Sequence, residues 1–119
     1  MTNDQRACMA FICGVKANAV LYKNIIHDYT QHKDYLFMVY EWEENNIRIY
    51  DIERNCIVQG EPTLLFNYYD GTYISLEWDG KDFRGFDYKS QNYYVGTVVE
   101  ERIQIYDYET TEFYLYELR

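Results

Sequence analysis

The chain has 119 residues, the usual size of one domain, with 48% hydrophobic residues, a single proline and a formal net charge of −9. This composition excludes an intrinsically disordered chain, and the negative charge argues against direct nucleic-acid binding, which needs a positive surface for the phosphates. The aromatic content is unusual, with 15 Tyr, 6 Phe and 2 Trp.

The charge is distributed unevenly along the chain. Residues 1–34 carry four basic and three acidic side chains, a net of +1, whereas residues 35–119 carry seven basic and seventeen acidic ones, a net of −10. Such a field favours solubility or the attraction of a basic partner.

Cysteine content and hydropathy indicate the compartment. Cys8, Cys13 and Cys56 are an odd number without a Cys-x-x-Cys spacing, which predicts buried thiols in a reduced, cytoplasmic protein. No apolar run approaches the ~20 residues of a membrane span, so no membrane contact is expected. The apolar stretch 7–15 does not predict a signal peptide, because Asp4 lies in the segment before it, Gly14 interrupts it and Lys16 lies in the would-be cleavage region.

A helix is predicted at the N-terminus. Thr2 to Gln5 fits a capping box, in which Thr2 accepts from the third helical N–H and Gln5 reaches back. Apolar residues then recur at steps of three and four: Cys8, Phe11, Val15, Ala19, Tyr22, Ile26 and Tyr29. This spacing predicts a helix as far as about Gln31, with a bend or a break at Gly14. A strand over 9–15 is the alternative.

From Tyr35 onward the hydrophobic period changes to two, which is typical of strands. The pattern predicts strands at 35–42 and 47–50, joined at Asn45-Asn46, and a break at 60–62. Asp70-Gly71 and Asp79-Gly80 then mark hairpin turns of a meander over 64–69, 72–78 and 81–88. Three further strands are predicted at 93–99, 102–108 and 112–118.

The element order predicts an α+β fold in one domain, 1–119, with a helical segment 1–34 and an antiparallel segment 35–119. We expect the helix to pack on a curved meander sheet, or a partly open barrel, of about seven to eight strands. One internal echo lies in the sheet: Ile47–Glu53 matches Ile103–Glu109 at an offset of 56 residues. Duplication of a hairpin and convergence on a common strand–turn pattern both explain it.

No motif for catalysis or for a cofactor is present, and neither His nor Cys spacing predicts a metal site. Asp70, Asp79 and Lys81 resemble loosely the two acids and lysine of metal-dependent nucleases. Asp79 is better explained as part of a turn, so a metal-dependent hydrolase is the least favoured alternative.

The leading hypothesis is a non-enzymatic acidic protein that covers a basic surface of a protein partner, as small inhibitors, immunity proteins and nucleic-acid mimics do. Tyrosines suit such a surface because they bury much area with few rotatable bonds. The residues predicted to supply charge and contact are Glu41, Glu43, Tyr50, Asp51, Glu53, Tyr106, Asp107, Glu109, Tyr114 and Tyr116. The same aromatic sheet surface could join two copies in a homodimer. A barrel-like protein with a small molecule in its mouth is the main alternative.

Overall fold

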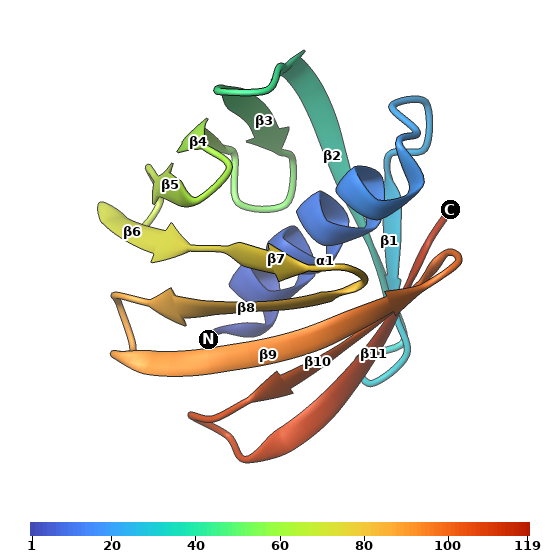
Figure 1. The fold of residues 1–119 in the computed structure, drawn as a ribbon, viewed down its shortest axis with the longest axis vertical. Coiled ribbons are helices and arrows are strands. Elements are labelled where there is room, and N and C mark those ends of the chain that lie inside the picture. The colour runs from blue at the N-terminus through green and yellow to red at the C-terminus, as the bar shows by residue number, and fades with distance from the viewer.

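A computed structural model describes residues 1–119, with one helix and eleven strands (Figure 1). The elements are α1 (Asn3–Asn18), β1 (Ile25–Asp28), β2 (Lys33–Trp42), β3 (Ile47–Asp51), β4 (Cys56–Glu61), β5 (Leu64–Asn67), β6 (Thr72–Ser75), β7 (Glu77–Asp79), β8 (Asp82–Asp87), β9 (Asn92–Val99), β10 (Arg102–Asp107) and β11 (Glu112–Leu118).

The strands form a closed antiparallel barrel in which each strand except β6 pairs with the next along the chain, and β1 pairs with β11 to close the ring. β6 and β7 are two parts of one wall strand: Ile74 pairs with Asp87 and Glu77 with Arg84 in a single register along β8. The barrel therefore has ten strand positions. The α+β class is confirmed, but the prediction of seven to eight strands in a sheet or partly open barrel is wrong.

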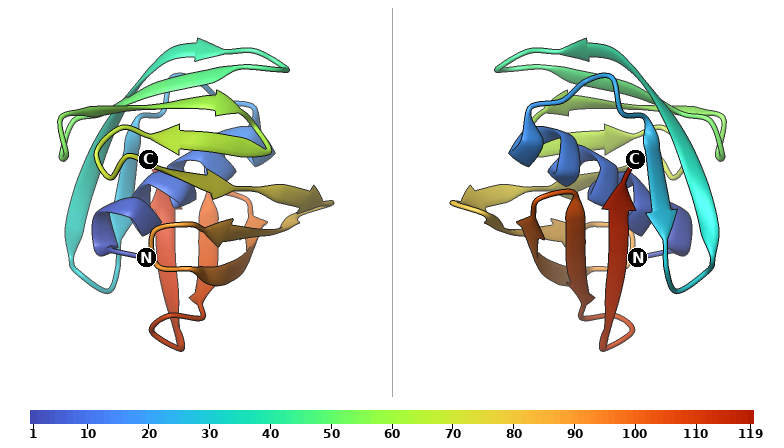
Figure 2. Two further views of the ribbon diagram at one scale, coloured as in Figure 1. Left: turned by 90° about the vertical axis from the view of Figure 1, so that its left-hand side faces the viewer. Right: turned by 90° about the vertical axis from the view of Figure 1, so that its right-hand side faces the viewer.

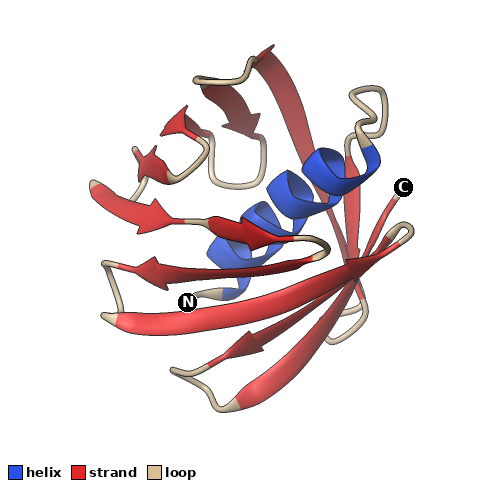
Figure 3. Cartoon of the chain, viewed as in Figure 1, coloured by secondary structure: helices blue, strands red, loops and turns tan.

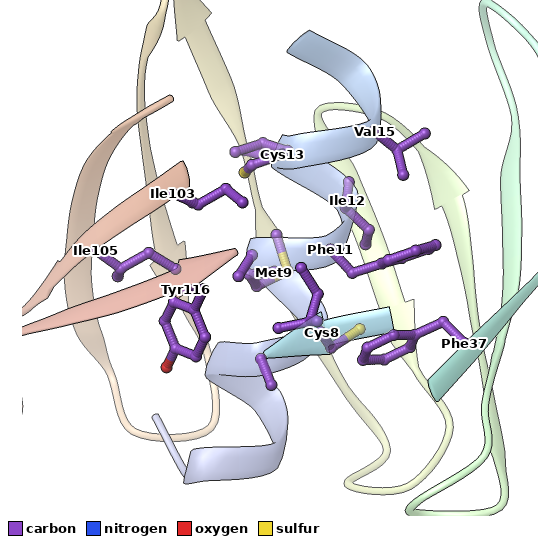
Figure 4. Packing of buried hydrophobic residues seen from close by; sticks show 14 of the residues in the cluster. Cys8, Met9, Phe11, Ile12, Cys13, Val15, Phe37, Ile103, Ile105 and Tyr116 are labelled. Atoms are coloured by element: carbon purple, nitrogen blue, oxygen red, sulfur yellow. The ribbon is translucent and has the colours of Figure 1, made fainter. Parts of the chain in front are cut away.

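Helix α1 lies inside the barrel, with strands around it in both side views of Figure 2 and in the view of Figure 3. Every residue from Gln5 to Val15 is buried, so the helix has no solvent-facing side over this stretch. A barrel of ten strands is wider than its own inward side chains fill, and the helix occupies the remaining space. Phe11 stacks on Phe37 at 4.6 Å, and the helix side chains interleave with Ile103, Ile105 and Tyr116 (Figure 4).

The N-cap at Thr2 is confirmed, since its hydroxyl accepts from the Gln5 N–H at 3.1 Å. The helix runs unbroken through Gly14, where an added Cβ would lie 3.0 Å from Ile103, so close packing rather than bending accounts for this glycine. It ends at Asn18 because Ala19 adopts a left-handed conformation. The predicted continuation to Gln31 is wrong: this segment contains β1 instead.

Five turns at one end of the barrel, here called the turn end, share one structure. Each turn begins at an inward-facing Asp or Asn, whose Oδ1 accepts a hydrogen bond from the backbone N–H two or three residues later. In each turn, the fourth residue after this Asp or Asn has a left-handed backbone conformation. The five residues are buried: Asp28, Asp51, Asn67, Asp87 and Asp107. The matching segments 47–53 and 103–109 occupy equivalent positions, so the sequence echo belongs to a five-membered structural repeat.

Much of the tyrosine excess lies on the outer side of these hairpins. In three of them, aromatic residues just before, just after and six residues beyond the buried Asp or Asn meet edge to face at 4.7–5.0 Å. These clusters are Phe66–Tyr68–Tyr73, Phe86–Tyr88–Tyr93 and Tyr106–Tyr108–Phe113. Such cross-strand pairs stabilise a sheet, which gives these aromatics a structural role beside any role in binding.

Candidate functional site

The principal hollows of the molecule lie on the outer face of β7–β10, where three of them meet at Val95. We call this surface the outer groove. Its largest part, about 740 Å³, includes Glu77, Arg84, Gln91, Asn92, Tyr93 and Tyr108 in its walls. A second part, the hairpin pocket, is about 300 Å³ and is lined by Glu77, Trp78, Asp79, Asp82, Phe83, Arg84 and Val95. Both are open to solvent.

The wall beneath the groove is shaped by Gly85. Tyr94 fills the space over this glycine from inside the barrel and donates its hydroxyl to the carbonyl of Ser75 at 2.6 Å. A Cβ on Gly85 would lie 2.0 Å from that carbonyl oxygen and 2.4 Å from the tyrosine hydroxyl. Ser75 in turn accepts the Phe86 N–H through its side chain at 2.8 Å. The interruption between β6 and β7 is therefore held in place by side chains.

The groove combines aromatic rings with carboxylates. Tyr93 and Tyr108 are 64% and 50% exposed, so their rings are accessible to a partner. Glu77 pairs with Arg84 at 3.2 Å, and both side chains are mostly exposed. Asp79 and Asp82 are direct cross-strand neighbours, and neither is in an ion pair. Like charges placed opposite each other destabilise a hairpin. A cation bound between the carboxylates of Asp79 and Asp82 would therefore stabilise it.

Four of the ten residues predicted from the sequence lie inside the barrel. Asp51 and Asp107 are 1% exposed because they cap turns, and Tyr114 and Tyr116 are 6% and 0% exposed because they occupy the inward phase of β11. The predicted contact surface therefore lacks these four side chains.

Tyr50, Tyr106, Glu53 and Glu109 lie at the turn end on the outside. Tyr50 and Tyr106 are half-buried in aromatic contacts of their own hairpins. Glu53 pairs with Lys33, and Glu109 lies 2.5 Å from the Met1 amino group. Tyr106 alone of the ten predicted residues also borders the outer groove.

Glu41 and Glu43 are exposed near the opposite end of the barrel, beyond the middle of β2 and in the turn that follows. Glu41 accepts a hydrogen bond from Asn46. The predicted residues are thus divided between both ends and between the inside and the outside, and they do not form one surface.

A buried ionic layer connects the helix N-terminus to the turn end. Arg6 lies 3.1 Å from Asp107 and 3.6 Å from the centre of the Tyr114 ring, while Arg54 lies 2.7 Å from Asp51. Burial raises the pKa of Asp51, and the contacts with Arg54 oppose that rise. Gln5 accepts from Arg54 at 2.8 Å, which joins the helix to this layer. These buried charges position elements and offer no open site.

The residues considered for a metal-dependent hydrolase do not meet. Asp70 lies in the turn before β6, where it contacts Asn67 at 3.0 Å, whereas Asp79 and Lys81 lie at the far end of the same wall strand. Seven residues of strand separate the two sites by about 20 Å. No group of three His, Cys, Asp or Glu side chains has a metal-binding arrangement. Burial raises the pKa of the Cys8 and Cys13 thiols, which disfavours the nucleophilic thiolate.

The ten site residues predicted from the sequence do not include the groove residues Trp78, Asp82, Tyr93 and Tyr108. One signal was present: Asp79 and Asp82 flank a two-residue loop, which places their side chains across from each other in a hairpin. The close approach of Tyr94 to Gly85 in the wall beneath the groove joins β9, β8 and Ser75 of β6, and it forms only in the folded barrel.

No protein-family model matches the chain, and comparisons with curated proteins and with solved structures gave no match either. The one helix lacks the length and apolar character needed to cross a membrane.

Proposed function

We propose that this chain is a non-enzymatic binding protein that receives a positively charged part of a protein partner in its outer groove. The observation that carries the proposal is the combination, in two adjoining hollows of the outer groove, of accessible Tyr93 and Tyr108 rings with the carboxylates of Asp79 and Asp82. Tyrosine is enriched at the energetic centres of protein interfaces, and unpaired carboxylates steer and select a basic partner.

The filled interior supports an outside site over a ligand inside the barrel. Barrels that hold small molecules leave a cavity between their strands, but here the side chains of Met9, Phe11 and Ile12 are fully buried where such a ligand would lie. The small-molecule alternative would therefore also have to use the outer groove.

The proposal is tested by affinity capture from the source cell with the wild-type protein and two double variants. Tyr93→Ser/Tyr108→Ser removes the groove aromatics, and Tyr22→Ser/Tyr40→Ser removes two other exposed tyrosines outside the groove. A partner identified with the wild type is then measured by calorimetry at 50 and 500 mM salt.

We expect the groove variant to weaken binding at least tenfold, the control variant to change it less than twofold, and high salt to weaken wild-type binding. Equal binding by the groove variant and the wild type would contradict the proposal, as would a partner without a basic surface.

A further inference from the structure

We infer that two copies of this chain join through the outer face of β2 and β3, related by a two-fold axis that runs between these strands and parallel to them. This inference goes beyond the proposed function, because it concerns another surface of the barrel and a second copy of the chain instead of a basic partner.

Hydrophobic side chains from three neighbouring strands form one continuous outer surface, here called the apolar face. Its six residues are Leu36, Met38, Tyr40, Tyr50, Ile52 and Ile57. The register of the sheet aligns them in rows, since Met38 lies opposite Tyr50 and Tyr50 lies opposite Ile57. Ile52 lies beside Leu36 and donates its backbone N–H to the Leu36 carbonyl at 3.2 Å. A contiguous apolar patch on the outside of a soluble barrel marks a contact surface.

The size of the apolar face suits a small dimer interface. Four of its residues are between 41% and 49% exposed: Leu36, Met38, Tyr40 and Ile52. With about 200 Å² for a fully exposed side chain of this size, these four and the half-buried Tyr50 and Ile57 expose roughly 450 Å². A standard interface buries about 800 Å² on each partner, and a little over half of that area is apolar. The apolar face therefore supplies the apolar share, and its polar rim completes the area.

The two strands are arranged so that the apolar face is complementary to itself. A two-fold axis between β2 and β3 places β2 of one copy over β3 of the other, at the same level along the strands. Met38 then packs on Tyr50 of the second copy, and Leu36 packs on Ile52 of the second copy, because these residues are cross-strand neighbours within one chain. Sheets that pack face to face keep their strands within about 30° of each other, which this axis allows.

The charges beside the apolar face also match a second copy. Glu41 lies directly opposite Arg48, so the same axis brings Glu41 of each copy to Arg48 of the other. Arg48 is in no ion pair within its own chain, and its guanidinium lies 5.7 Å from the centre of the Tyr40 ring. Asp34, on the same side of β2, contacts the His27 ring at 2.7 Å. In a chain with a net charge of −9, this nearly neutral surface is where two copies meet with little repulsion.

The outer groove stays open in such a dimer. β3 and β9 are five positions apart in the ring of ten, so the apolar face and the groove lie on opposite sides of the barrel (Figure 1). The dimer therefore presents two grooves that face away from each other.

The experiment measures the mass of the full-length protein by analytical ultracentrifugation from about 1 to 500 µM, the range in which an interface of this size dissociates. Met38→Ser/Ile52→Ser removes two side chains of the apolar face. Leu21→Ser/Val99→Ser is the matched control, since these aliphatic residues are 51% and 57% exposed outside that face. Arg48→Glu and Glu41→Arg/Arg48→Glu test the charge pair, and circular dichroism verifies that each variant is folded.

We expect the wild-type mass to rise with concentration from that of one chain to that of two. Met38→Ser/Ile52→Ser should weaken dimerisation at least tenfold, and the control should change it less than twofold. Arg48→Glu should weaken it at least fivefold, whereas Glu41→Arg/Arg48→Glu should restore it, because the two charges are then exchanged and still opposite.

A single-chain mass at every concentration would overturn the inference and leave the apolar face to a different protein. Growth beyond two chains, undiminished dimerisation of Met38→Ser/Ile52→Ser, or failure of the exchanged pair to restore it would overturn the inference as well. Partner capture through Tyr93 and Tyr108 is measured separately, so each of these results leaves the proposed function standing.

Discussion

Replacing Arg6 by Met tests whether the buried ionic layer holds the helix in the barrel. The guanidinium is 1% exposed and makes its hydrogen bonds to Asp107 at 3.2 Å, to Asn3 at 2.9 Å and to the Met1 carbonyl at 2.8 Å. Methionine fills part of the volume but leaves Asp107 buried with one cation fewer. Breaking a buried pair on one side costs roughly 3–5 kcal/mol. Because the Met1 amine still lies 2.9 Å from Asp107, we expect a loss near the lower limit, about 3 kcal/mol.

The assay is urea unfolding at pH 7, followed by tryptophan fluorescence. Arg84→Met is the matched control, since its pair with Glu77 is solvent-exposed and should contribute less than about 1 kcal/mol. Arg6→Met/Asp107→Asn should be more stable than the sum of the single losses predicts, because the second change removes the stranded charge. A loss below about 1 kcal/mol for Arg6→Met, or strict additivity in the double variant, would refute the reasoning.

Three further predictions concern the wall, the buried phenols and the buried thiols. Gly85→Ala should destabilise the protein by about 2 kcal/mol or more in urea unfolding, because its Cβ would overlap backbone, and by more than Gly71→Ala, where the Cβ meets no atom within 4 Å and the loss comes only from the left-handed φ of +69°; equal losses would contradict this packing. Burial raises the pKa of Tyr35 to about 12, so its contribution to stability is present below pH 10 and falls by about 2 kcal/mol as the pH rises to 12; unfolding curves that do not change over that range would argue against a buried phenol. Cys8 and Cys13 should react with iodoacetamide only when the protein unfolds, and fast labelling of native protein, detected by mass spectrometry, would place them at the surface.

The wall of the barrel could be predicted largely from local patterns. Eight of the ten wall strands were expected near their observed positions, and 72–78 was correctly treated as one strand. Alternation and Asp-Gly turns suffice for this because they act between neighbours in sequence. Two strands were missed: β4 has no clear alternation, and β1, with four residues, continues the helical spacing of the preceding residues.

The closure of the barrel and the place of the helix could not be derived from the same patterns. Closure requires β1 to pair with β11, which are about ninety residues apart in sequence. The stretch 7–15 is apolar around all sides of the helix, which is typical of a fully enclosed helix, and this was the available signal for its position. Similarly, the Asp-Tyr steps at Asp28, Asp87 and Asp107 mark the repeated turns, but the burial of these residues is a property of the folded barrel, in which Asp107 lies 3.1 Å from Arg6 at the helix N-terminus.

For the candidate site, the amino-acid composition suggested which residue types a binding surface would use, but it did not predict where on the barrel that surface would lie. Charge and tyrosine content suggested a basic partner, and the groove combines the same residue types. Many tyrosines are used to stabilise hairpins or to fill the barrel, as Tyr116 does, and a count of residues cannot separate these roles. Which rings are accessible follows from the outward phase of the strands and from the side chains packed around each ring in the folded barrel.

The most direct test of the account is to map a basic peptide on the protein by amide NMR. Titration of ¹⁵N-labelled protein with triarginine amide should shift the backbone signals of β7, β8 and β9, with the largest changes near Asp79, Asp82 and Val95. These shifts should decrease with added salt. Shifts concentrated on β2 and β3, or at the five turns of the turn end, would contradict the proposal that the outer groove receives the partner.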